Sequence, residues 1–384
     1  MQLDRLLASF KLWDYRGWDP YDGLNSEVLG KVPFLSSRRL FRLAWIQLFK
    51  RLPINMRKPL RIRKGYNVKG LALILSGMIM LSKKPRYSLQ DEMDDVIKLI
   101  MLNRTPGEKY YCWGYNFFWQ ARAFSVEPFK PNMIVSTFVA QAFLDYYDYS
   151  GQSQYLEIAI DVATFIRSEL MIDETPTEIC FGYIPGELTR VHNANLMGAK
   201  LFARLYSITS VQEFKDVSVK STAYSIKRQN SDGSWYYGES AHHQWVDNFH
   251  TGFNLVAISE IQEFLGINYK NEISKGFRYH LNNHFAPDLT PKYYNNSLYP
   301  IDIHNYAQGI ITFIMMEKQK DAKTLLDMAN GKMKSQSGSY YYQKNRWYTN
   351  RINYFRWSQA WMFYATALLN SNLRHEIGLD DNAD

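Results

Sequence analysis

Residues 136–147 read STFVAQAFLDYY, and the same plan of sequence returns four times further along the chain. Each copy begins with a small or polar residue, carries Gly or Ala at close spacing and continues as an apolar helix. The copies start 59, 56, 54 and 53 residues apart and are NLMGAKLFARLY (195–206), TGFNLVAISEI (251–261), NYAQGIITFIM (305–315) and SQAWMFYATALL (358–369). A near-constant period of this size indicates stacked supersecondary units.

A second set of helices lies between these copies and shows a different pattern. In residues 155–170 the apolar residues follow the i, i+3, i+4, i+7 spacing of a helix with one buried face. The repeated helices are apolar almost all round, so we expect them to form an inner layer that is covered on both sides. The amphipathic set then forms an outer layer, near 36–51, 88–103, 153–171, 211–228, 271–285 and 319–330.

An apolar helix expected at 67–82 completes the inner set, whose other members lie near residues 134, 194, 250, 304 and 356. Six inner and six outer helices are enough to close an all-α (α/α)6 toroid, a six-hairpin barrel. An open α-solenoid of the same repeats is the structural alternative. We expect residues 1–384 to form one toroid domain, with a loop segment (1–35) packing over the ring and a short flexible tail from about 373 to 384.

Aromatic side chains are abundant, with 22 Phe, 28 Tyr and 10 Trp in 384 residues. Tyr and Trp join a flat apolar face to a polar group, which suits sugar rings, and packing in a core is the alternative use. Only two cysteines are present, Cys112 and Cys180, and the N-terminus has no apolar run of signal-peptide length. These features favour reduced thiols and a cytoplasmic protein.

The net charge of +8 arises locally, because residues 31–70 contain many Lys and Arg but no Asp or Glu. We therefore expect no nucleic-acid partner. Within this segment, residues 35–52 (LSSRRLFRLAWIQLFKRL) predict a basic amphipathic helix. We expect this segment to be the outer helix of the first hairpin, with its basic face in solvent. The alternative is a helix that lies on the anionic surface of the inner membrane.

In a ring of helical hairpins, the loops that enter the inner helices line one mouth of the central cavity. These loops carry three of the eight His at matched repeat positions, and two of the three have an Asp nearby. Such a match favours a shared site over isolated structural residues. The catalytic candidates are His192, His250, His304, Asp247, Asp302 and, from the turn-rich segment WDPYDGLNS (18–26), Asp22.

The same loops carry aromatic and polar residues of the kinds that contact a glycan. The substrate-binding candidates are Tyr21, Trp113, Tyr115, Asn116, Glu187, Asn193, Trp245, Arg351, Tyr354, Arg356 and Trp357. A His/Asp metal site is a further alternative, but neither HExxH nor CxxC spacing is present, so we expect no metal and no cofactor.

Two kinds of chemistry fit these residues, and the sequence does not choose between them. Glycoside hydrolysis needs two carboxylates that flank the scissile bond, from Asp22, Glu187, Asp247 and Asp302. Lyase or C5-epimerase chemistry needs a base beside a uronate carboxylate whose charge is neutralised. Its proton carriers would come from His192, His250, His304 and Tyr354, and its neutralising cation from Arg351 or Arg356.

Residues 229–237 (QNSDGSWYY) follow an outer helix, and their Asp-Gly pair predicts a turn from which Trp235 clamps neighbouring hairpins. This motif is similar to the QxxDGxW turn of terpene cyclases and other α-toroids, and residues 337–340 (SGSY) look like a degraded copy. The acidic DxDD signature of terpene cyclases is missing from the chain, which argues against isoprenoid cyclisation.

Five motifs together carry a family resemblance: WDPYDGLNS, DGSWYYG, WVDNFHTGFN, YPIDIHNYAQ and RWSQAWM. Through them the chain resembles, from about residue 13 to 370, a bacterial family of polysaccharide biosynthesis proteins. The resemblance implies the toroid fold and the pathway better than it implies a reaction. At the level of fold the chain is also similar to six-hairpin glycosidases, polysaccharide lyases and sugar epimerases, an analogy that assigns no residues.

We therefore expect a carbohydrate-active protein of capsule, exopolysaccharide or O-antigen metabolism. It would act on an oligo- or polysaccharide in the toroid cavity by hydrolysis, elimination or epimerisation. The basic segment is compatible with an acidic glycan and with a lipid-linked one. The alternative is a non-catalytic glycan-binding or scaffold subunit of a glycosyltransferase complex.

Overall fold

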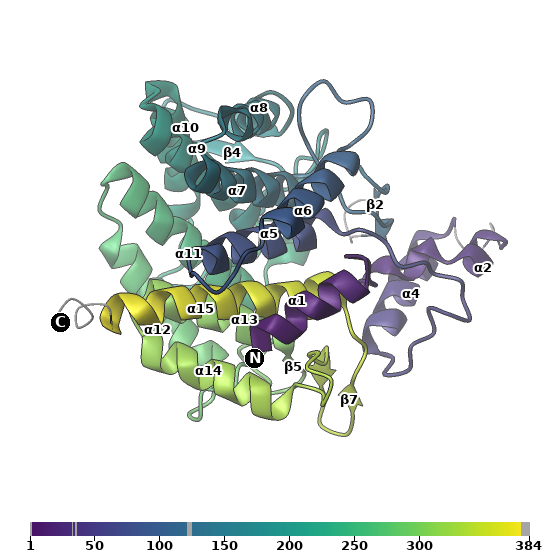
Figure 1. Cartoon of the computed structure of the whole chain (residues 1–384). Coiled ribbons are helices and arrows are strands. Elements are labelled where there is room, and N and C mark those ends of the chain that lie inside the picture. Colours follow the sequence, from purple (N-terminus) through teal and green to yellow (C-terminus); the bar gives the residue numbers. More distant parts are fainter. Residues whose placement is uncertain (1, 33, 35–36, 121–124, 378–384) are drawn as a thin grey trace.

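The computed structural model describes residues 2–377 except 33, 35–36 and 121–124, and its helices pack as pairs around a ring (Figure 1). Each inner helix contacts the next one along the chain, and the last contacts the first, so the ring is closed. This closure confirms the (α/α)6 toroid and excludes the open solenoid. The inner helices are α5 (Val68–Ser82), α7 (Met133–Ser150), α9 (His192–Thr209), α11 (Asn248–Leu265), α13 (Ile303–Met315) and α15 (Trp361–Ile377).

The outer layer consists of one amphipathic helix against each inner helix. Five of them follow their inner partner in the chain, and the sixth, α1, packs against α15 and so joins the two ends of the chain. None of the described helices is long and apolar enough to cross a bilayer. The outer helices are α6 (Gln90–Leu102), α8 (Ser153–Glu169), α10 (Gln212–Ile226), α12 (Lys270–His284), α14 (Gln319–Lys332) and α1 (Gln2–Leu12).

The sixth outer helix was expected at 36–51, and the structure corrects this. The basic segment does form a helix, α4 (Arg39–Arg51), but it packs against the short helix η1 (Asp22–Asn25) and strand β1 (Trp119–Gln120) beside the ring. The outer position belongs to α1, because Leu3, Leu6 and Phe10 give it a buried apolar face.

Both ends of the chain are more helical than expected. Residues 1–35 are not one loop segment, since α1 and α2 (Glu27–Gly30) lie within them. The tail expected from about residue 373 is helical as far as Ile377, and its remainder lies outside the described residues.

Short antiparallel strands occupy several of the connections between helices. They pair as β1 with β2 (Ser125–Val126), and as β3 (Met171–Glu174) with β4 (Ile179–Phe181). A three-stranded sheet joins β5 (Ile301–Asp302), β6 (Gln343–Lys344) and β7 (Thr349–Asn350).

The turn at residues 229–237 has the clamping role expected of it. Gly233 adopts a φ of +95°, and a Cβ there would lie 2.4 Å from the carbonyl oxygen of Lys275, so only glycine fits. Trp235 is buried against Gly276 of α12 and donates its indole N–H to the carbonyl of Ser225 at 2.9 Å. The turn therefore fastens two neighbouring hairpins together.

The first turns of the inner helices are fixed by polar caps. Asn67, Asn132, Asp247 and Asp302 precede α5, α7, α11 and α13, and the side chain of each accepts a hydrogen bond from a backbone N–H of the first turn. Such caps satisfy groups that a helix leaves unpaired at its start. They also orient the residues that follow, which is how the fold builds its cavity.

Candidate active site

A cavity of about 730 Å³ opens at the N-terminal ends of the inner helices. Each inner segment contributes the second residue after its cap to the wall, a regularity that follows from the repeated fold. For the last segment the cap is Tyr354, which precedes a short π-helix, η3 (Phe355–Ala360), that leads into α15. The wall residues at this position are Lys69, Ile134, Asn193, Phe249, His304 and Arg356. Aromatic rings form most of the rest, namely Tyr21, Tyr115, Phe117, Trp119, Phe138, Tyr183, Tyr237, Trp245, Phe253, Tyr293, Tyr294 and Trp357.

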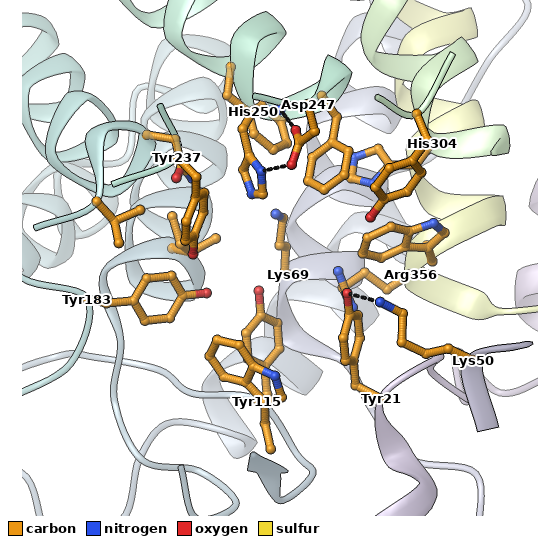
Figure 2. A pocket seen from close by; sticks show the side chains of 18 of the residues that line it. Tyr21, Lys50, Lys69, Tyr115, Tyr183, Tyr237, Asp247, His250, His304 and Arg356 are labelled. Atoms are coloured by element: carbon orange, nitrogen blue, oxygen red, sulfur yellow. Dashed lines mark hydrogen bonds and ion pairs between the residues drawn. The ribbon is translucent and has the colours of Figure 1, made fainter. Parts of the chain in front are cut away.

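Asp247 and His250 form a hydrogen-bonded pair at the start of α11 (Figure 2). His250 Nδ1 lies 2.7 Å from Asp247 Oδ2, and the backbone N–H of His250 donates to Asp247 Oδ1 at 2.9 Å. The indole N–H of Trp245 donates to the same carboxylate at 3.2 Å. Because a carboxylate accepts only, Nδ1 carries the proton, and the Nε2 of neutral His250 is left as a base.

The electrostatics of this pair favour an ionised carboxylate. Burial opposes the charge on Asp247, but the charge of His250 when its ring is protonated, together with the hydrogen bonds from His250, outweighs burial and holds the pKa of Asp247 below its usual value. The His250 ring is about one-fifth exposed and packs against Tyr237, with ring centroids 4.6 Å apart. The pair can therefore take a proton from a molecule in the cavity.

His304 lies in the same wall but has a different environment. Its ring is sandwiched between Phe249 and Trp361, with centroids 4.9 and 4.7 Å away, and Trp357 meets it edge-on. Neither ring nitrogen has a hydrogen-bond partner among the described residues, although His304 is only 1% exposed. Burial, with the nearby charge of Lys69, holds the pKa of His304 well below its usual value, so the ring is neutral.

Arg356 is the guanidinium of the cavity wall. Its Nε and Nη2 donate to the two carboxylate oxygens of Asp19 at 2.7 and 2.9 Å, a bidentate pair in which both residues are buried. Despite burial, the charge of Asp19 keeps the pKa of Arg356 above its ordinary value. The cavity thus has a permanent positive charge at this point.

Lys69 is a cavity residue that the sequence reasoning missed. It lies in the first turn of α5, is 4% exposed and extends between His250 and Arg356 in Figure 2. A signal was present, because Lys69 follows its helix cap Asn67 by two residues, as His304 follows Asp302. Tyr183, Tyr237 and Tyr293 were missed as well. Tyr183 and Tyr293 lie on connecting segments outside the repeated motifs, and Tyr237 ends the 229–237 turn, for which only a structural role was expected.

Nine of the residues singled out from the sequence line this cavity. They are Tyr21, Tyr115, Asn193, Trp245, Asp247, His250, His304, Arg356 and Trp357. The remaining eight lie outside its wall, and most have contacts that explain their positions.

Asp302 and His192 are fully covered behind the wall. Asp302 accepts hydrogen bonds from the indole of Trp357, the amide of Gln343 and the backbone of His304, and burial raises its pKa to about 6. It positions two wall residues without facing the cavity. The ring of His192 lies 3.4 Å from the hydroxyl of Ser225, and burial lowers its pKa to about 4.

Asp22 is held in a buried ion pair with Arg57, whose Nε donates to its Oδ1 at 2.8 Å. Burial raises the pKa of Asp22 to about 7, against the opposing charge of Arg57. Arg57 also donates to the carbonyl of Asp19 and lies over the ring of buried Tyr354. This group anchors the segment 18–26 to the ring.

Four other candidates have local structural contacts. Trp113 is buried and donates to the carbonyl of Ile100, while the carbonyl of Asn116 accepts from Asn25. Glu187 accepts from Thr189 within its own loop, and Arg351 is exposed over the ring of Tyr341. None of the four belongs to the cavity lining.

Several solved structures with a similar fold are carbohydrate enzymes. A cellobiose 2-epimerase from Bacillus thermoamylovorans aligns with a TM-score of 0.62 at 12% identity, over 82% of this chain and 90% of the epimerase. A family 76 glycoside hydrolase (mannosidase) from Bacteroides thetaiotaomicron gives 0.59 at 13%, over 81% and 87%. An α-1,6-mannanase from Salegentibacter gives 0.57 at 12%, over 81% and 90%.

These likenesses define the class of protein by its fold. The chain is an (α/α)6 toroid of the type found in sugar epimerases and family 76 glycoside hydrolases. No protein-family model matches the chain, and no curated protein matches it significantly by sequence. At these identities the comparisons establish the fold alone.

Proposed function

We propose that the chain is a carbohydrate-active enzyme that moves a proton at a carbon of a sugar, as an epimerase or a polysaccharide lyase, with His250 as the base. The Asp247–His250 pair at the cavity wall carries this proposal. The carboxylate fixes the tautomer and stabilises the imidazolium that forms when Nε2 takes the proton.

The charges of the wall support proton transfer over hydrolysis. Glycoside hydrolysis needs two carboxylates on either side of the scissile bond. Among the described residues, Asp247 is the only carboxylate in the cavity lining, and it is bonded to His250. The other two acidic candidates with substantial burial, Asp22 and Asp302, bond to protein groups elsewhere.

The aromatic wall supports a sugar as the bound molecule. Tyr237 and Trp245 stack with ring centroids 4.7 Å apart, and the hydroxyls of Tyr115, Tyr183 and Tyr237 point toward the cavity in Figure 2. Flat apolar faces pack on the C–H faces of pyranose rings, while hydroxyl groups bind those of the sugar. Following the resemblance of the sequence motifs, we propose that the substrate is an oligo- or polysaccharide of bacterial surface polysaccharide production. The cytoplasmic location is a prediction from the sequence.

The direct test is mass spectrometry of a panel of acidic and neutral bacterial oligosaccharides after incubation with the enzyme in D₂O. Deuterium gained without cleavage indicates epimerisation, and cleavage with an unsaturated end indicates a lyase. Cleavage with added water would replace the proposal by hydrolysis. Binding without any chemical change would favour the alternative, a glycan-binding or scaffold subunit of a glycosyltransferase complex.

We further propose that α4 contacts an anionic membrane surface, which would bring a lipid-linked glycan to the cavity. Leu40 and Leu48 of α4 are 80% and 51% exposed. Leu43 and Lys50 of the same helix line the cavity, so α4 would hold the cavity close to the membrane surface. Trp347, 83% exposed on the β6–β7 turn, lies near the C-terminal end of α4, because its neighbour Tyr348 donates to the carbonyl of Arg51. Exposed apolar side chains amid basic residues are typical of a membrane-surface helix.

Sedimentation with lipid vesicles tests this contact. Wild type is expected to sediment with vesicles of phosphatidylglycerol and phosphatidylcholine, but not with phosphatidylcholine alone, and high salt should release it. The double variant Leu48→Ser/Trp347→Ser should lose most of this binding. Val211→Ser, which alters an exposed apolar residue before α10, is the matched control and should bind as wild type does. Equal binding by all three proteins would contradict the proposal.

A further inference from the structure

The cavity carries more positive than negative charge. Lys50, Arg51, Lys69 and Arg356 line it, against one described carboxylate, Asp247. That carboxylate is bonded to His250, and Arg356 has its own partner in Asp19. Lys69 makes no hydrogen bond or ion pair with any described residue, so its buried amine lacks a counter-ion that would stabilise the charged form.

The surroundings of Lys69 make this lack of a counter-ion costly. Its Nζ lies 4.2 Å from the ring centre of Phe138, 5.1 Å from that of Trp361 and 5.3 Å from that of Phe253. Rings attract a cation, but they do not replace the water that burial removes. Burial, with the charge of Arg356, accordingly holds the pKa of Lys69 well below its usual value.

A second unsatisfied group lies in the same wall. Within the described part of the chain, both ring nitrogens of His304 lack hydrogen-bond partners, although the residue is 1% exposed. A buried polar group without a hydrogen bond destabilises a protein unless something else supplies the bond. Both groups pack against the rings of Trp361 and Phe253, and the amine of Lys69 in the cavity wall indicates the place of an anionic part of a ligand.

We infer that the cavity binds an acidic sugar, a hexuronic acid residue whose carboxylate lies against Lys69 beside Arg356. This inference rests on the proposed function and specifies its substrate class. An anion supplies the counter-ion that Lys69 lacks, and Lys50 and Arg51 at α4 attract acidic glycans toward the mouth.

The chemistry of the base favours a carboxylate over a sulfate or phosphate. When His250 takes the proton from the carbon beside the carboxylate, the C–H bond breaks, an N–H bond forms at Nε2, and the electron pair enters the carboxylate group. Cations beside that group stabilise the charge that develops there. Return of a proton to the opposite face of that carbon completes epimerisation. In elimination the electron pair instead forms a C=C bond as the neighbouring C–O glycosidic bond breaks, and the leaving oxygen takes the proton held at Nε2.

Calorimetry with matched oligosaccharides tests the inference. The probes are tetrasaccharides of glucuronate, galacturonate and mannuronate, each compared with its own methyl ester, in which the carboxyl group is uncharged. At least one acid form should bind about 10- to 100-fold more tightly than its ester. Lys69→Met should abolish that preference, while Lys83→Met, at the exposed far end of α5, should retain it.

Proton uptake separates a direct contact from a structural effect. An anion bound to Lys69 raises its pKa, so wild type should take up protons on binding at pH values between the lowered pKa of the free enzyme and the higher pKa of the complex, seen as a heat that depends on the buffer. Lys69→Met should fold, because Met fills the apolar surroundings without a charge, and should show no uptake. Equal affinity for acids and esters would overturn the acidic substrate, even if deuterium exchange on neutral sugars upheld the proposed reaction. Tighter binding of a sulfated tetrasaccharide than of every uronate would overturn the carboxylate assignment.

Discussion

Replacing His250 by Ala is expected to lower the rate of deuterium exchange into the sugar by about 10²- to 10⁴-fold, the range that a positioned general base contributes. The loss should fall on kcat with little change in KM, because the aromatic wall that holds the sugar stays intact. His242→Ala, which alters an exposed neighbour on the same connecting segment, is the matched control and should retain wild-type activity.

Asp247→Asn tests the pair more finely. The amide oxygen can still cap α11, so the helix should remain, but the group no longer stabilises an imidazolium at His250. The rate should therefore fall by about 10²-fold or more while the melting temperature changes little. Wild-type rates in both the His250 and the Asp247 variants would show that another group, with Lys69 the next to examine, removes the proton.

The ring could be predicted from the sequence because its inner helices repeat. The copies starting at Ser136, Asn195, Thr251 and Asn305 lie in inner helices, and the copy starting at Ser358 runs from the π-helical turn 355–360 into α15. One physical requirement, burial on both sides, shapes them alike. The repeat also predicts that equivalent residues converge on one cavity, and the second residue after each cap does so.

The parts of the fold that differ from the sequence-based expectation lie in segments outside the repeat. Residues 39–51 form an amphipathic helix as expected, but periodicity cannot tell which surface its apolar face covers. The face of α1 depends on few residues, and Phe10 is buried only because Phe355 and Phe363, distant in the chain, meet its ring. Partners of this kind are set by tertiary packing.

Among the site residues, too, some could be predicted from local sequence patterns and others depend on tertiary packing. His250 and His304 were identified because imidazoles beside an Asp suggest chemistry, whereas Lys69 looked like any other residue of a basic segment. Asp302 has the same sequence context as Asp247, yet it bonds to Trp357 and Gln343 and turns away from the cavity. Whether a carboxylate faces substrate or supports a neighbour depends on donors far away in the sequence.

Removing the guanidinium of Arg57 is expected to give the largest loss of stability among the changes considered. Arg57→Met leaves the buried carboxylate of Asp22 without its partner, and breaking such a pair from one side costs about 3–5 kcal/mol of unfolding free energy. Arg63→Met is the matched control, because Arg63 pairs with Glu27 at the same distance of 2.8 Å on the surface. Its cost should be below about 1 kcal/mol. Urea denaturation followed by circular dichroism measures both.

The double variant Arg57→Met/Asp22→Asn decides between two roles for Asp22. If the carboxylate anchors segment 18–26, removing both charges should recover much of the stability lost in Arg57→Met, because no unpaired charge remains buried. Exchange activity should recover with it, since Asp22 lies outside the cavity lining. A double variant that regains stability but lacks activity would instead restore Asp22 to the catalytic group, and it would imply that segment 18–26 moves when the sugar binds.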